Sequence, residues 1–113
     1  MGKSKSEHFS EETNALSAIG KCISHPARIA IIEFLLKSES CVCGDIVANL
    51  PLSQSTVSQH LKELKSIGLI KGEISGPNVC YCIDLTQWNL FNQKIGAFFN
   101  QVPKSMECGI DCC

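Results

Sequence analysis

Residues 51–73, PLSQSTVSQHLKELKSIGLIKGE, decide the fold of this chain. Ser53 is a favourable N-cap residue, and Gly68 is a favourable C-terminal stop for a helix. Between them, three apolar residues recur at the spacing that gives a helix one apolar face: Val57, Leu61 and Leu64. After Gly68 the apolar period changes from 3.6 residues to 2, which is typical of a strand. The stretch therefore predicts a helix over 53–67 that leads directly into a β-hairpin.

The other face of this helix is polar and basic, with Glu63 as its only acid. Its side chains donate and accept hydrogen bonds or carry positive charge: Gln54, Ser55, Ser58, Gln59, Lys62 and Lys65. In the major groove of DNA, Gln pairs with adenine, Ser and Thr bind several base edges, and Lys binds phosphate or guanine. The face therefore indicates a DNA-recognition helix; the alternative is an ordinary solvated helix face.

The residues before this stretch predict three more helices. Residues 11–24 have apolar residues at helical spacing, and Pro26 marks the start of a second, central helix in HPARIAIIEFLLKSE. A short third helix is expected over 43–50, ended by Pro51. A short helix followed by a polar one is typical of a helix-turn-helix.

The residues after it predict a hairpin and a last helix. Strands are expected over 70–75 and 78–84, on either side of the GP turn. Alternation in the second strand directs Val79, Tyr81 and Ile83 to the core and puts Cys80 and Cys82 on the outer face. The last helix, 86–102, has an apolar stripe wider than one small core needs, which indicates contact with a second subunit.

Together these elements predict a mainly α protein with a small β-hairpin, a winged helix-turn-helix in the order α-α-α-α-β-β-α. We expect a flexible N-terminal tail over 1–10, a DNA-binding and dimerisation domain over 11–103, and a Cys-containing C-terminal tail over 104–113. The chain has 113 residues, enough for one domain, and a net charge of −1, so any affinity for DNA depends on where the basic groups lie.

No apolar run has membrane length, and the start of the chain lacks a signal peptide, so we expect a cytoplasmic protein with no membrane partner. No arrangement of Cys, His and acid, no phosphate loop and no paired carboxylates indicate catalysis, so we expect no enzyme activity and no organic cofactor. Eight cysteines are many for a chain of this length. In a reducing compartment, clustered cysteines indicate metal binding or redox chemistry.

The first cysteine pair, Cys41 and Cys43, lies in SCVCGDIV at the expected start of the third helix. Side chains two residues apart diverge in a regular helix, so the pair converges on one ion only where the backbone is frayed or non-helical. Soft ions prefer sulfur, and As(III) or Sb(III) is satisfied by two or three thiolates. The alternative is a pair of small buried hydrophobic residues.

Four segments, HPARIAIIEFL, CVCGDIV, LSQSTVSQHLKELKSIGLI and GPNVCYCID, resemble in this order the ArsR/SmtB family of bacterial winged-helix repressors. The resemblance covers roughly residues 15–100. It implies a homodimer built on the first and last helices, a two-fold-symmetric double-stranded operator, and release when an inducer binds. It also implies the DNA-binding residues: Gln54, Ser55, Thr56, Ser58, Gln59 and His60, with Lys62 and Asn78 as supporting contacts. A packed or capping role is the alternative for His60, and a structural role is expected for His25.

The resemblance also implies where a metal would bind. The zinc-sensing type uses histidine on the last helix, but this chain has no histidine after His60. The thiol type uses Cys41 and Cys43, our first choice, and often a third cysteine where this chain has Ile46. The tail ECGIDCC supplies a second choice: Cys108, Cys112 and Cys113. Cys80 and Cys82 are a less specific pair, and Cys22 is expected in the core.

The sequence therefore predicts a DNA-binding repressor that releases its operator when As(III), Sb(III) or another thiophilic ion binds cysteine thiolates. One alternative keeps the fold and makes the cysteines a redox or persulfide switch. Another is a cysteine-rich metal-buffering protein that does not bind DNA.

Overall fold

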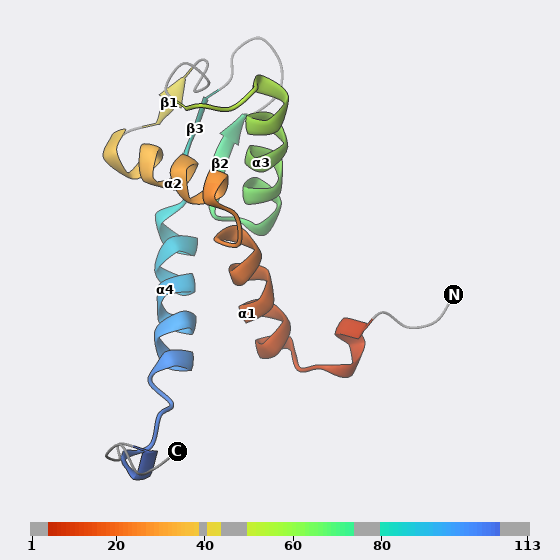
Figure 1. Ribbon diagram of the computed structural model, residues 1–113, viewed down its shortest axis with the longest axis vertical. Helices are drawn as coiled ribbons and strands as arrows, with labels where there is room; N and C mark the ends of the chain where they lie inside the picture. The colour runs from red at the N-terminus through yellow and green to blue at the C-terminus, as the bar shows by residue number, and fades with distance from the viewer. Residues whose placement is uncertain (1–4, 39–40, 44–49, 74–79, 107–113) are drawn as a thin grey trace.

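The computed structural model describes residues 5–38, 41–43, 50–73 and 80–106. Along the chain its elements are η1 (Lys5–His8), α1 (Glu11–Cys22), α2 (Pro26–Ser38), β1 (Val42–Cys43), α3 (Gln54–Ile67), β2 (Ile70–Glu73), β3 (Cys80–Ile83), α4 (Leu85–Phe99) and η3 (Lys104–Met106). In Figure 1 the helices α2 and α3 and the sheet pack together as one body, and α1 and α4 both extend below it. The predicted fold class, mainly α with a small hairpin, is confirmed.

The first two helices begin where the sequence predicts, because side chains cap them. The Ser10 hydroxyl accepts a hydrogen bond from the Thr13 N–H at 3.1 Å at the start of α1. Pro26 is the first residue of α2, and His25 Nδ1 accepts from the Ala27 N–H at 3.0 Å. His25 therefore has the structural role expected of it.

The sheet has three antiparallel strands in the order β1-β3-β2, one more than predicted. The helix expected over 43–50 is wrong at its first residue, because Cys43 belongs to β1; residues 44–49 lie outside the described residues. Val42 has Tyr81 as its partner across the ladder and packs against the core, which favours strand geometry over a helical turn. The hairpin strands are shorter than predicted, and their connection, 74–79, also lies outside the described residues.

The core lies between α2, α3 and the inner face of the sheet. Ile31 and Leu64 are fully buried, and Tyr81 is 1% exposed at the centre of the sheet. The other members of the cluster come from the same elements, from the end of α1 and from the connection between α3 and β2: Cys22, Ile32, Leu35, Val57, Leu61, Leu69 and Ile70. In this core the apolar face of α3 packs against α2 and the sheet. The opposite face of α3 points outward.

The helix α4 is amphipathic in sequence but has no buried residue. Asp84 caps its start by accepting from the Gln87 N–H at 3.2 Å. Its far end presents Phe98, 50% exposed, and Phe99, 70% exposed. The radius of gyration is 17.6 Å, whereas a compact domain of this length has about 13 Å. None of the described helices is long and apolar enough to cross a membrane.

Candidate DNA-binding face and thiol cluster

Both ends of α3 are closed by the residues that the sequence singles out. The Ser53 hydroxyl accepts from the Thr56 N–H at 3.3 Å and lies 2.8 Å from the Thr56 hydroxyl. Gly68 adopts a left-handed conformation, with φ of 95°, and its N–H bonds to the carbonyls of Leu64 and Lys65. These caps stabilise the two helix ends and confirm the predicted limits of the helix.

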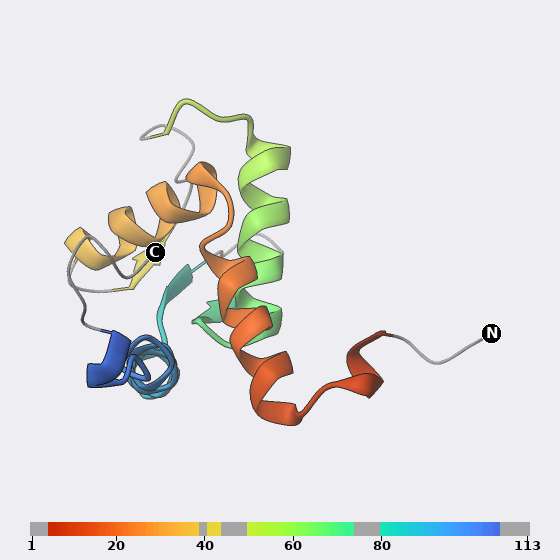
Figure 2. The same cartoon turned by 60° about the horizontal axis from the view of Figure 1, so that its bottom comes forward.

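The polar face of α3 is turned away from the core. The residues most open to solvent on it are Gln54, Ser55, Gln59, Lys62 and Lys65, while Thr56, Ser58 and His60 are half-buried. In Figure 2, α3 runs along one flank of the body and α4 is seen end-on on the other side. The structure thus places seven of the eight predicted DNA-binding residues on one helix; the eighth, Asn78, lies outside the described residues.

The only acid on this face, Glu63, is held by neighbouring groups. Glu63 forms an ion pair with Arg28 of α2, and its carboxylate also accepts a hydrogen bond from the Gln59 amide at 3.2 Å. Arg28 is only 14% exposed in its side chain, so the pair is partly shielded from water. Arg28 was not identified in the sequence analysis. The one sequence feature that could have indicated it is its place as a basic residue in the first turn of α2.

His60 is joined to the same cluster rather than projecting freely. Arg28 Nε donates to His60 Nδ1 at 3.1 Å, and the His25 ring lies with its centroid 5.0 Å from that of His60. Burial lowers the pKa of His60, and electrostatic interactions with Arg28 and with His25 lower it further. Since a neutral Nδ1 is the acceptor that Arg28 requires, His60 links α2 to α3 in its uncharged form. Its contact with DNA stays a prediction.

This lowered pKa predicts a pH-dependent stability. The unfolded chain takes up a proton at His60 more readily than the folded chain, so stability is lost as the pH falls below the ordinary histidine pKa of about 6.5. We expect the free energy of unfolding, measured by urea titration, to decrease from about pH 7.5 to about pH 5.5.

His60→Asn supplies a hydrogen-bond acceptor that cannot be protonated. We expect the free energy of unfolding of this variant to decrease less over the same pH range. His8→Asn, in exposed η1, is the control for removal of a histidine. An unchanged pH profile in His60→Asn would show that the α2–α3 cluster does not sense protonation.

The cysteines of the two C-x-C pairs lie together across one ladder. Cys41 and Cys82 form a disulfide with their Cα atoms 4.4 Å apart. Cys43 is opposite Cys80 in the register, and Cys80 is also disulfide-bonded. Because side chains alternate along a strand, positions 41, 43, 80 and 82 share one face, opposite the core face of Tyr81. In the sequence analysis these are two separate pairs, whereas in the structure all four positions lie on one face of the sheet.

The remaining cysteines differ from these four. Cys22 is 1% exposed and is a free thiol in the core, as expected. Burial raises the pKa of Cys22, against the opposing effect of Arg28, so it remains protonated near neutral pH. Cys108, Cys112 and Cys113 lie outside the described residues. Among the described side chains, no three His, Cys, Asp or Glu residues are grouped as metal ligands.

Comparison with known proteins yields a consistent set of relatives. A family model for "Bacterial regulatory protein, arsR family" matches residues 25–71. The HTH-type transcriptional repressor SmtB of Mycobacterium tuberculosis is 41% identical over 71 residues, 63% of this chain and 52% of that protein. The arsenical resistance operon repressor of Staphylococcus xylosus is 31% identical over 80 residues, 71% of this chain and 76% of that protein.

A solved structure has a fold similar to that of this chain. The ArsR-like transcriptional regulator from Rhodococcus sp. RHA1 superposes with a TM-score of 0.57 at 20% identity, over 82% of this chain and 88% of that one. The chain therefore spans most of the Rhodococcus fold and about half the length of the SmtB relative. The match to a family of transcriptional regulators also confirms the prediction that the chain is not an enzyme.

Proposed function

The chain belongs to the arsR family of bacterial regulatory proteins, and from this premise we propose that it is a transcriptional repressor that binds double-stranded operator DNA through α3 and releases it when a thiophilic ion binds its cysteines. The observation that carries the proposal is the outward face of α3. That face offers amides, hydroxyls and lysines, and its one carboxylate is paired with Arg28.

The electrostatics of α3 suit a nucleic acid in spite of the negative net charge of the chain. DNA phosphates are attracted by local positive charge, which Lys62 and Lys65 supply at exposed positions. Glu63 would repel phosphate if it were unpaired, but its ion pair with Arg28 of α2 offsets its charge. Gln54, Ser55 and Gln59 remain exposed beside the lysines and have the hydrogen-bonding groups that read base edges.

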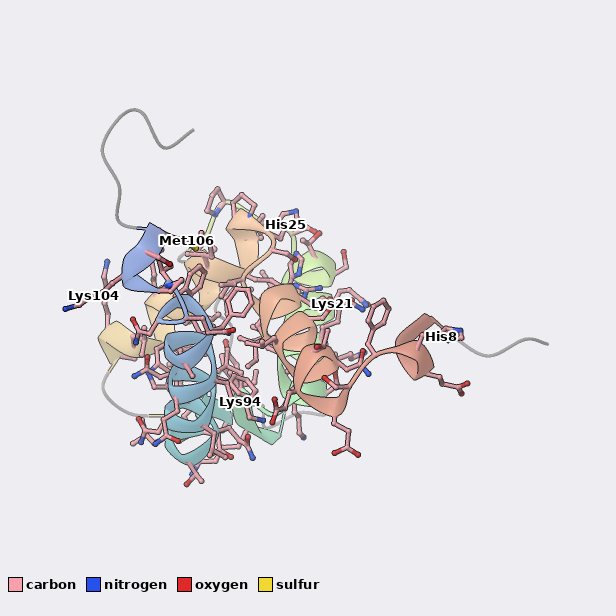
Figure 3. All side chains as sticks on the ribbon, turned by 90° about the horizontal axis from the view of Figure 1, so that it is seen from below. His8, Lys21, His25, Lys94, Lys104 and Met106 are labelled. Carbon is pink, nitrogen blue, oxygen red and sulfur yellow. A yellow bond between two sulfur atoms is a disulfide. The ribbon has the colours of Figure 1, made fainter. Side chains whose placement is uncertain are left out.

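We propose that two copies of the chain assemble on α1 and α4. The N-terminal half of α1 and the C-terminal half of α4 line a cavity of about 650 Å³. Its lining residues include Leu16, Ala97 and Phe98. Figure 3 shows α1 and α4 from below, with side chains of both helices around the space between them. A second copy would cover the exposed apolar end of α4. α1 packs against α3, but α3 lies on the side of the body away from α4, so we expect a two-fold dimer to leave both recognition helices open to a two-fold-symmetric operator.

The proposed inducer is As(III) or Sb(III), bound by Cys41 and Cys43, with the tail Cys108, Cys112 and Cys113 as the second choice. The non-helical backbone that a C-x-C pair needs is supplied by β1. An ion there would pull on β1, which pairs with β3, which pairs with β2, the strand that follows α3. The relative named for arsenical resistance supports this choice of ion. Release requires only that the ion bind the DNA-incompetent form more tightly.

The test is operator binding by the reduced chain, with and without arsenite. We expect salt-dependent binding to a palindromic promoter fragment, weakened by arsenite on the order of 10- to 100-fold. Cys41→Ser with Cys43→Ser should bind the same fragment with unchanged affinity and lose the arsenite response. The control is a truncation after Lys104, which removes the tail cysteines and should respond as the full chain does.

Each contrary outcome has a defined meaning. If the truncation loses the response and the double variant keeps it, the tail is the sensor. If the chain binds arsenite but no duplex at any salt concentration, it is a metal-buffering protein and the proposed function is wrong.

The disulfide between Cys41 and Cys82 favours a second candidate function, a repressor that senses thiol oxidation or persulfides. The two candidate functions can be distinguished by the conditions under which the protein releases DNA. A metalloid sensor releases DNA on arsenite with all thiols kept reduced, whereas a redox sensor releases DNA on oxidant or polysulfide and rebinds it on addition of dithiothreitol.

A further inference from the structure

We infer that Cys82 of β3 is the third thiolate of the ion site, so that one As(III) or Sb(III) is held by Cys41, Cys43 and Cys82 across two strands. This inference rests on the proposed function, because it completes the site proposed there. The C-x-C pair has no third cysteine within its own segment, where Ile46 stands. The structure supplies the missing sulfur from a residue far away in the sequence.

The backbone register supports this assignment. Cys41 and Cys82 are joined through their sulfur atoms, and their Cα atoms are 4.4 Å apart, so the two thiols of the reduced chain meet without movement of either strand. Position 43 is on the same face of the ladder, two residues from position 41, which is about 7 Å along a strand. Trivalent arsenic bound to three sulfurs is pyramidal, and Cys41 and Cys82 supply two of these sulfurs from neighbouring strands.

Charge distinguishes Cys82 from its neighbour Cys80. Cys41 is exposed, and Cys82 and Cys80 are half-buried, so the face is open to a small ion. The register on the other edge of β3 places Lys71 opposite Cys82. A positive charge stabilises a thiolate. The charge of Lys71 therefore favours Cys82 as the third ligand.

The chemistry balances once the disulfides of this face are open. A phosphine and one water convert each of them, that of Cys41 with Cys82 and that of Cys80, to two thiols and a phosphine oxide; in the cell, two molecules of a thiol reductant do the same for each disulfide and leave as their own disulfide. Arsenous acid, As(OH)₃, then reacts with three thiols, forming three As–S bonds and breaking three As–O bonds. Each thiol proton leaves with one hydroxide as water. Arsenic remains trivalent throughout.

A site that spans β1 and β3 explains how ion binding reaches the recognition helix. Cys41 and Cys82 are separated by 41 positions in the sequence, and this interval contains all of α3 and β2. An ion bound only within residues 41–43 would act on one edge of the sheet. An ion that also binds Cys82 fixes both ends of the segment that carries α3, so it biases the orientation of that helix directly.

The test compares Cys82→Ser with Cys80→Ser in the full chain, reduced by a phosphine because dithiothreitol itself chelates arsenite. These positions lie two residues apart on the same face of β3, so they serve as matched variants. Arsenite affinity is measured by calorimetric titration, and the ligating thiols are mapped by their protection from alkylation. We expect Cys82→Ser to lose on the order of 100-fold in arsenite affinity and Cys80→Ser less than about 10-fold. Arsenite should protect positions 41, 43 and 82.

Four outcomes decide the inference. Unchanged arsenite affinity in Cys82→Ser, or a loss in Cys80→Ser as large as in Cys82→Ser, would overturn it. If Cys41→Ser with Cys43→Ser abolishes operator release while Cys82→Ser releases normally, the proposed function stands and the inference alone fails. If the titration confirms all three ligands but arsenite never releases DNA, the inference stands and the proposed function fails.

Discussion

Replacement of Gly72 by alanine is expected to lower the free energy of unfolding by about 3 kcal/mol. Gly72 lies in β2 with φ of 119°, a conformation that residues with a Cβ rarely adopt. A Cβ at this position would overlap the carbonyl oxygen of Cys80 and lie 2.9 Å from Cα of Tyr81. Both atoms are backbone of the central strand, so neither can move aside without breaking the sheet.

Gly20→Ala is the matched control, because nothing lies within 4 Å of its added Cβ in α1. Alanine in a helix is favoured over glycine by about 0.5–1 kcal/mol, so this variant should be slightly more stable than the wild type. Denaturant unfolding followed by circular dichroism measures both. A Gly72→Ala protein within about 0.5 kcal/mol of the wild type would show that β2 and β3 do not approach as closely as described.

The second large effect is expected at the end of α4. Phe98→Glu with Phe99→Glu places four carboxylates in the proposed dimer interface and removes four apolar rings from it. Burial of one such ring contributes about 1.5 kcal/mol or more, so the dimer dissociation constant should rise at least on the order of 1,000-fold. Analytical ultracentrifugation over a range of protein concentrations measures this constant. Because both rings are at least half exposed in one chain, the fold of the monomer should survive.

Operator binding should be lost together with dimerisation, because a monomer presents one recognition helix to a two-fold site. Leu36→Glu is the control: this leucine of α2 is 45% exposed and lies outside α1 and α4. A dimer that survives the double substitution would place the interface elsewhere.

Local signals predicted most of the helical framework. Ser53 and Gly68 at the ends of α3 and Pro26 at the start of α2 act through their own dihedral angles and nearest hydrogen bonds, and each has the predicted role. The apolar positions of α3 also face the core as expected. Such features can be predicted from the sequence because each depends on residues within one helical turn of it.

The thiol face could not be predicted in the same way. β1 has two residues, too few for a period of two to be recognised, and its partner strand is some 40 positions away in the sequence. Strand pairing at that distance depends on the tertiary fold and leaves no local pattern. For the same reason the ion pair between Arg28 and Glu63 was missed: each residue belongs to a different helix, and only the packing of α2 on α3 joins them.

The alternation in β3 has a consequence for how such a protein diversifies. Tyr81 belongs to the core, whereas Cys80 and Cys82 belong to the opposite face. Evolution or design can therefore exchange the side chains at positions 80 and 82 for imidazoles or carboxylates and so change the selectivity of the proposed ion site. The hydrophobic interior and the outward face of α3 need no compensating change.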